Sequence, residues 1–166
     1  MKSYFNKDLK NLSKEKLIQM IDYYRRDDLT GFYGRKDFER EFHEIFHNFK
    51  NEGKKFYLSL IDINGLHQVN REEGYFAGDN LIKKVASCIS YNCNGDAYRI
   101  GGDELAILSD VSNVGNCKTH EDYVIVECSS DKYKSSMEMF KDCDQRLIEA
   151  KAEYYKTTGK DRRGRS

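Results

Sequence analysis

Apolar residues follow two kinds of spacing along this chain, one typical of helices and one typical of strands. Helical spacing occurs in four stretches, at 13–24, 35–50, 79–90 and 135–155. Apolar runs rich in β-branched and aromatic residues occupy 56–62, 96–100, 105–108 and 123–128. Because these elements alternate, we expect an α/β protein of the α+β sandwich type, in which helices flank a central, mainly antiparallel sheet.

The widest helical stripe lies in 35–50 and is largely aromatic. Its members are Phe38, Phe42, Ile45, Phe46 and Phe49. A stripe this wide indicates a helix packed on the core. His43 and His47 lie one helical turn apart on the same stretch. Since no third ligand has a suitable spacing, we interpret them as packing or solvated histidines rather than as a metal pair.

The first helical stretch begins at Ser13, a residue type that caps helices. Its apolar stripe consists of Leu17, Ile18, Ile21 and Tyr24. One such stripe supports two interpretations equally. The helix either packs on its own domain or pairs with a partner as a dimerising stalk.

Length and composition narrow the class of protein. A chain of 166 residues fits one domain with a real core. Lysine plus arginine equals aspartate plus glutamate, at 28 each, so we expect no nucleic-acid partner. No signal peptide and no apolar run of membrane-spanning length is present, and we expect a cytoplasmic protein without membrane association. Five cysteines without a Cys-x-x-Cys pair predict reduced thiols.

Candidate chemistry begins at 101–104, where the sequence Gly-Gly-Asp-Glu separates two β-prone runs. This pattern predicts a hairpin with Asp103 and Glu104 at its tip, and its two glycines would allow positive φ angles there. Gly101 and Gly102 would also let a ligand approach the main chain, because they have no side chains. A Gly-Gly-Asp turn alone is usually only a turn, so a functional interpretation needs a second acidic site.

The second acidic site is Asp62, at the end of the run 56–62 and just before Asn64 and Gly65. If this strand is a neighbour of the hairpin, Asp62 and Asp103 can share a magnesium ion. Magnesium prefers hard oxygen ligands and keeps positions for water or substrate phosphates. Two carboxylates and a phosphate-bearing substrate would complete such a site.

Several segments together resemble the GGDEF-domain family, the diguanylate cyclases. The hairpin 101–104 resembles the family signature, and 27–35 resembles its D-x-L-T-G-L-x-N-R motif. The segment 62–79 is similar to its D-x-D-x-F-K block, and 143–151 is similar to its A-D-x-A-L-Y-x-A-K helix. The resemblance covers roughly 27–151, and motifs in the correct order are far more specific than one motif alone.

The resemblance implies a fold, an activity and an assembly. The fold would be similar to the palm of nucleotidyl cyclases and polymerases. An N-terminal helical segment at 1–26 would precede a catalytic domain at 27–158 and a basic tail at 159–166. The activity would be condensation of two GTP molecules into cyclic di-GMP. Because each domain would hold one GTP, an active enzyme implies a homodimer, stable or transient, across a two-fold axis.

The resemblance also implies a metal site. Asp62 and Asp103, with the carbonyl of Ile63, would hold Mg²⁺ or Mn²⁺. Glu104 would be a further metal ligand or would help to deprotonate the attacking 3′-hydroxyl.

Other residues would bind the substrate. Asn70 and Asp79 would read guanine through complementary hydrogen bonds. Lys151, the main chain of the two glycines, and His67 at the position of a family lysine would face the phosphates. Each of these residues also has a purely structural explanation. Asp62 could cap a strand end, and Asn70 and Asp79 could cap helices.

Departures from the family pattern leave other functions open. His67 would be mostly neutral near pH 7, and Leu66 and Arg71 also replace family residues. The stretch 109–122 fits only a polar loop where the family has a helix, and the product-binding R-x-x-D motif is missing at 92–95. The alternatives are a degenerate domain that binds GTP or another nucleotide without turnover, a domain that makes a different dinucleotide, and a protein that pairs with an active cyclase.

Overall fold

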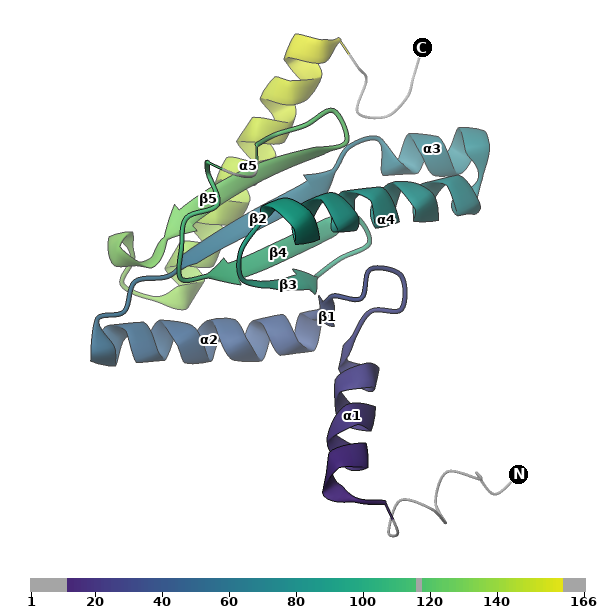
Figure 1. The fold of residues 1–166 in the computed structure, drawn as a ribbon. Helices are drawn as coiled ribbons and strands as arrows, with labels where there is room; N and C mark the ends of the chain where they lie inside the picture. The colour runs from purple at the N-terminus through teal and green to yellow at the C-terminus, as the bar shows by residue number, and fades with distance from the viewer. Residues whose placement is uncertain (1–11, 116–117, 160–166) are drawn as a thin grey trace.

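The computed structural model describes residues 12–115 and 118–159. Their strands form one five-stranded sheet with helices on both faces (Figure 1). The strands are β1 (Tyr33–Gly34), β2 (Tyr57–Ile63), β3 (Asp96–Arg99), β4 (Glu104–Ser109) and β5 (Tyr123–Ser129). They follow the spatial order β1-β3-β4-β2-β5, and only β1 and β3 pair in parallel. The expected α+β sandwich with a mainly antiparallel sheet is confirmed.

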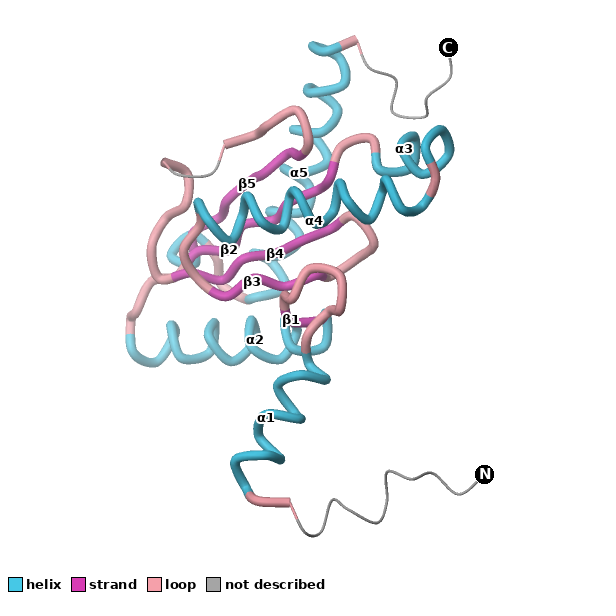
Figure 2. The backbone as a smooth tube through the Cα atoms, turned by 45° about the vertical axis from the view of Figure 1, so that its right-hand side comes forward, coloured by secondary structure: helices cyan, strands magenta, loops and turns pink. Residues whose placement is uncertain are grey.

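The described part contains five helices, most of which pack around this sheet. They are α1 (Lys14–Arg25), α2 (Arg35–Glu52), α3 (Leu66–Glu73), α4 (Tyr75–Asn92) and α5 (Ser136–Thr158), with a short 3₁₀ turn, η3, at Ser130–Lys132. Helices α2 and α5 pack on one face of the sheet and α4 packs on the other (Figure 2).

The alternation of β2 decides which layer each of its side chains meets, because successive residues of a strand point to opposite faces. Leu58 and Leu60 belong to the core beneath α2 and α5, whereas Ile61 and Ile63 belong to the core beneath α4. Asp62 shares the face of Leu58 and Leu60. Its carboxylate therefore points to the α5 side of the sheet.

The aromatic stripe of α2 is core, as predicted. Three of its rings are buried: Phe38, Phe42 and Phe46. The two histidines of this helix have protein partners. His43 Nδ1 lies 2.7 Å from Ser136 Oγ, and His47 Nδ1 lies 3.2 Å from the side-chain amide of Asn51. These contacts agree with packing and solvated roles.

Helix α1 extends away from the sheet (Figure 1). Ser13 caps it as expected, since its hydroxyl accepts from the Lys16 amide at 3.3 Å. None of the residues of α1 is buried, and Ile18 and Ile21 are 55% and 58% exposed. The interpretation that packs its apolar stripe on its own domain is therefore wrong.

Strand β1, helix α3 and the short turn η3 were not predicted, and one helix begins earlier than predicted. Strand β1 has only two residues, and α3 is mostly polar, so neither produces a clear apolar period. Helix α4 begins at Tyr75 rather than at 79, because Tyr75 and Phe76, 80% and 77% exposed, lie outside the buried stripe on which the prediction rested. Gly74, at φ 89°, ends α3 and begins α4.

Two further expectations concern the cysteines and the membrane. Cys88, Cys128 and Cys143 are free thiols, whereas Cys93 is disulfide-bonded, so the prediction of reduced thiols is wrong for Cys93.

Within the described ranges, no helix combines the length and the apolar character that a membrane crossing requires. The described parts of 109–122 contain no helix, which agrees with the predicted loop.

Candidate active site at the ends of strands β2 and β4

Strands β2 and β4 are neighbours in the sheet and bring the predicted acidic residues together. Asp62 lies directly opposite Glu104 in their antiparallel register, so both side chains are on one face. The Ile63 amide donates to the Asp103 carbonyl at 2.9 Å, which places the hairpin tip beside the end of β2. The expectation that these two strands are adjacent is confirmed.

Lys151 of α5 forms an ion pair with Asp62. The two side chains are only 13% and 14% exposed. Burial raises the pKa of the Asp62 carboxyl, and the charges of Asp103 and Glu104 act in the same direction, while Lys151 opposes them. Negative charge is thus concentrated at this point. The pairing was not predicted, because 89 positions separate the two residues.

The hairpin turn does not use the positive φ angles that its two glycines would allow. The described glycines with positive φ do not include Gly101 or Gly102. The turn closes through amides of Ile100 and Gly101 that donate to the Glu104 carbonyl at 2.9 and 3.2 Å. A Cβ at Gly101 would lie 2.5 Å from Glu104 Oε2. Gly101 is therefore required to make room for the Glu104 side chain, which starts β4 and is not at the tip.

Arg99 connects the hairpin to the segment 27–35. Its guanidinium lies 3.1 Å from an Asp27 carboxylate oxygen and donates to the Gly102 carbonyl at 2.8 Å. Thr30 donates to Asp27 through its amide and its hydroxyl at 2.9 and 2.8 Å. Sequence reasoning missed Arg99, although a cation two positions before the paired glycines was a signal that it contacts the turn.

Helices α3 and α4 hold the predicted base-reading residues. A Cβ at Gly78 would lie 1.8 Å from Asn70 Oδ1, so the amide of Asn70 lies against α4 at the position just before Asp79. Asn70 is inside α3 and Asp79 is inside α4, which excludes both as helix caps. Asp79 and His67 are exposed, with His67 in the first turn of α3.

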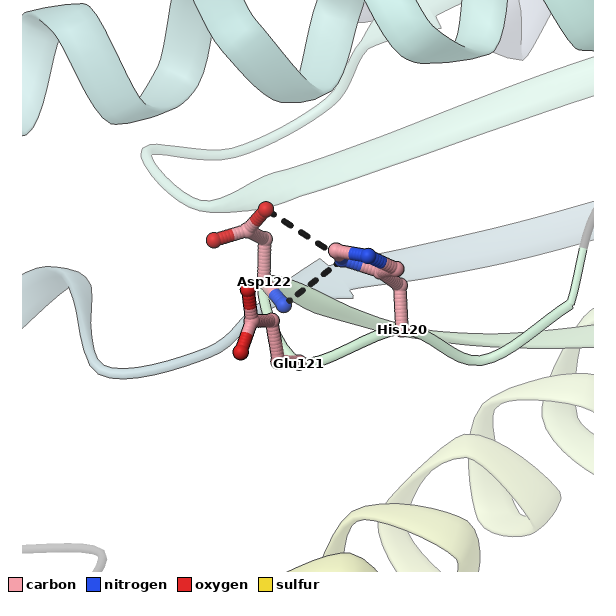
Figure 3. Close-up of side chains that lie close together, drawn as sticks. All are labelled: His120, Glu121 and Asp122. Atoms are coloured by element: carbon pink, nitrogen blue, oxygen red, sulfur yellow. Dashed lines mark hydrogen bonds and ion pairs between the residues drawn. The ribbon is translucent and has the colours of Figure 1, made fainter.

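A second group of metal-type donors, His120, Glu121 and Asp122, lies just before β5 (Figure 3). Their ligand atoms lie within 4.8 Å of one another. Asp122 is already paired, with Lys84 Nζ at 2.7 Å and with His120 Nδ1 at 3.2 Å. We therefore interpret this group as an ion-paired turn.

Comparison with known proteins places this geometry in a family. Residues 24–128 match the family model described as diguanylate cyclase, GGDEF domain. The chain belongs to the GGDEF-domain family. The predicted resemblance is confirmed, and the acidic residues of β2 and of the hairpin both lie inside the matched segment of this GGDEF chain.

Individual relatives cover part of the chain. Diguanylate cyclase VdcA of Vibrio cholerae serotype O1 is 29% identical over 98 residues, which are 58% of this chain and 28% of that protein. Probable diguanylate cyclase DgcI of Escherichia coli strain K12 is 31% identical over 97 residues, 57% of this chain and 21% of that protein. The GGDEF chain thus spans less than a third of the length of either relative.

A solved structure shows the same fold. The coiled coil and GGDEF domain of DgcB from Caulobacter crescentus, in complex with c-di-GMP, aligns with a TM-score of 0.67 at 20% identity. The alignment covers 90% of this chain and 88% of that one. At this identity the likeness concerns the arrangement of helices and strands.

Proposed function

We propose that this GGDEF chain acts as a diguanylate cyclase, which condenses two GTP molecules into cyclic di-GMP. The observation that carries the proposal is the grouping of Asp62, Asp103 and Glu104 at two adjacent strand ends, with the ammonium of Lys151 beside them. The relatives named as diguanylate cyclases support this activity over other nucleotide chemistry.

The donor set at the strand ends fits Mg²⁺ or Mn²⁺. Asp62, Asp103, Glu104 and the Ile63 carbonyl offer hard oxygen ligands. Burial raises the pKa of Asp62 and the charges of Asp103 and Glu104 add to it, and a divalent cation would relieve that repulsion. When bound, the ion would neutralise charge on the reacting phosphates. Glu104 would bind the ion too or accept the proton of the attacking 3′-hydroxyl.

The remaining residues would orient the nucleotide. Asn70 and Asp79 would bind the guanine edge, since their helices pack together at Gly78. Lys151 would neutralise the phosphates, and the main chain at 101–102 would approach them. A Cβ at Gly102 would meet nothing within 4 Å, which supports an open approach on that side of the turn.

Two copies would have to face each other, because each would hold one GTP. We assign the catalytic domain to 27–158 and treat 1–26 as a separate helical segment. The exposed apolar stripe of α1 supports a role as a dimerising stalk. The basic tail assigned to 159–166 lies beyond the described residues except for Gly159.

The test is an assay of products. Purified protein is incubated with GTP, ATP and their mixtures in Mg²⁺ or Mn²⁺, and products are identified by mass spectrometry beside Asp103→Ala. Cyclic di-GMP that the variant does not make is the expected result. A different dinucleotide would preserve the chemistry but would overturn the assignment of Asn70 and Asp79 to guanine.

A second candidate function is nucleotide binding without turnover, by this domain alone or paired with an active cyclase. It is favoured by His67, which stands exposed at the start of α3 in place of the family lysine. Absence of any product, together with thermal stabilisation by GTP, would select this alternative. Introducing His67→Lys should then raise GTP affinity, because a permanent positive charge would face the triphosphate.

A further inference from the structure

The acidic strand ends already hold a cation that belongs to the chain. Lys151 Nζ is paired with Asp62, and no other ion pair of Asp62, Asp103 or Glu104 occurs within the described ranges. Both members of the pair are largely withdrawn from water. A carboxylate in such a position requires a compensating charge, since an unpaired buried charge is strongly unfavourable.

The position of Lys151 follows from the packing of α5. Cys143 and Leu147, which are eight and four residues earlier on the helix, are both buried against the sheet. Residues four apart share one face of a helix, so Lys151 continues the buried stripe and points to the end of β2. One turn later, Tyr155 accepts from the Gly65 amide at 3.3 Å. The helix is thus fixed to the strand end on both sides of Lys151.

We infer that Lys151 is an internal counter-ion that a divalent metal must displace from Asp62. The inference rests on the proposed function, which places a metal and a triphosphate at this site. Lysine is a compact charge on a flexible stem, so its ammonium can leave Asp62 without movement of α5. The released ammonium then becomes available to the phosphates. Metal and nucleotide therefore assist each other, because the metal frees the group that the triphosphate needs.

Binding of Mn²⁺ to the full chain tests this competition directly. Free Mn²⁺ is measured by electron paramagnetic resonance for the wild type, for Lys151→Met and for Lys156→Met. Lys156 is on the same helix but is 81% exposed, so it is the matched control. Without nucleotide, Lys151→Met should bind Mn²⁺ about tenfold more tightly than wild type. The reason is that the ion pair with which Mn²⁺ competes is absent in this variant. Lys156→Met should bind it unchanged.

Nucleotide coupling gives a second result from the same titration. A non-hydrolysable GTP analogue should tighten Mn²⁺ binding in the wild type and in Lys156→Met. In Lys151→Met this tightening should be largely lost, because no ammonium is released. Equal or weaker Mn²⁺ affinity in Lys151→Met, with coupling intact, would overturn the inference.

Asp62→Asn separates this inference from the proposed function. If Asp62→Asn abolishes Mn²⁺ binding while Lys151→Met leaves it unchanged, the metal site stands and the competition does not. If the wild type and Asp62→Asn bind Mn²⁺ equally, the proposed metal site fails and the inference fails with it.

A measurement on the unaltered protein covers the case in which Lys151→Met does not fold. Acetic anhydride modifies accessible lysines, and mass spectrometry reports each site with and without Mn²⁺. Lys151 should be modified slowly without metal and several times faster with it. Lys50, whose Nζ donates to the Tyr133 carbonyl at 2.8 Å, is the reference and should not change. An unchanged rate at Lys151 in saturating Mn²⁺ would contradict displacement.

Discussion

At the scale of single residues, Asp27 and Arg99 show how a distant motif supports the hairpin. Arg99 contacts both the Asp27 carboxylate and the Gly102 carbonyl, so one side chain joins the segment 27–35 to the turn. Although burial alone would raise the pKa of Asp27, hydrogen bonds from Thr30 and the charge of Arg99 hold it below its ordinary value. The ionised carboxylate therefore stabilises the folded state.

Replacement of Asp27 with asparagine should destabilise the protein in a pH-dependent way. Because the pKa is lower in the folded state, the stabilisation is present above the unfolded pKa of about 4 and is lost as pH falls through the folded value. Asp27→Asn should reduce the free energy of unfolding by about 1–2 kcal/mol at neutral pH, and the difference should shrink in acid. Urea titrations from neutral pH into acid measure it.

The control for this prediction is Asp28→Asn at the next position, which is exposed. It should leave the free energy of unfolding close to that of the wild type at every pH. If the free energy of unfolding differs by the same amount between wild type and Asp27→Asn at every pH, the contacts of Asp27 do not depend on its charge.

Sequence reasoning identified the acidic residues but not the cations that face them. Asp62, Asp103 and Glu104 could be predicted from the sequence because each lies at a recognisable strand end or turn. Lys151 and Arg99 meet their partners across 89 and 72 positions. Such long-range ion pairs depend on how helices and strands pack together. Local sequence patterns carry no information about that packing.

At the scale of elements, the contact between α3 and α4 is made possible by Gly78. A Cβ there would meet the far end of the Asn70 side chain, at 1.8 Å from Oδ1, and Leu66 Cδ1 at 3.2 Å. The amide of Asn70 can rotate away, whereas the backbone of α3 need not move. The glycine therefore positions Asn70 more than it stabilises the helix pair.

Gly78→Ala should accordingly separate stability from nucleotide binding. Alanine is favoured over glycine within helices by about 1 kcal/mol, which offsets the local crowding, so the free energy of unfolding should change by less than about 1 kcal/mol. GTP affinity should fall as far as in Asn70→Ala, since the amide is displaced in both. Calorimetry of GTP binding and urea unfolding measure the two quantities.

Gly115→Ala is the matched control, because a Cβ at Gly115 would meet nothing within 4 Å. It should change neither quantity. If Gly78→Ala retains full GTP affinity, Asn70 does not read the base from this position.

Elements with strong apolar periods were predictable, and those without were not. The stripe of α2 and the continuous runs of β2 and β5 gave the sheet and its main helices. Helix α3 has the sequence LHQVNREE, in which only two residues are apolar, and β1 has two residues in all. Contacts with neighbouring elements stabilise both α3 and β1, and neither has an apolar period of its own.

At the scale of the whole molecule, the link from α4 to β3 bears on regulation. This segment, 92–95, is where the family carries its product-binding R-x-x-D motif. A Cβ at Gly95 would lie 2.2 Å from the Leu108 carbonyl, and Gly95 has φ 103°. Asn113 also clamps the neighbouring Asn94, accepting from its amide at 2.8 Å and donating to its carbonyl at 3.1 Å. An aspartate does not fit here.

We therefore expect no feedback inhibition through this segment. The rate of product formation should stay within about twofold when cyclic di-GMP is added, since a twofold change is less than 0.5 kcal/mol of interaction. Initial rates at increasing product concentration measure it. Tight binding of cyclic di-GMP that Asn94→Ala abolishes would contradict this prediction.

The last prediction concerns α1 and the meeting of two copies. Deletion of 1–21 removes Leu17, Ile18 and Ile21 but keeps Arg25, which pairs with Asp37 at 2.8 Å. Because no residue of α1 is buried, the free energy of unfolding should change by less than about 0.5 kcal/mol. GTP affinity should also be unchanged, since the proposed site lies at the strand ends.

Product formation, in contrast, should become limited by encounter between two copies. The rate per molecule should fall at low protein concentration and recover as concentration rises, because each copy holds only one GTP. Ile18→Ser with Ile21→Ser in the full chain should reproduce the effect, while Glu15→Ser with Gln19→Ser on the opposite face should not. A deletion variant that matches the full chain at every concentration would show that α1 does not bring the two copies together.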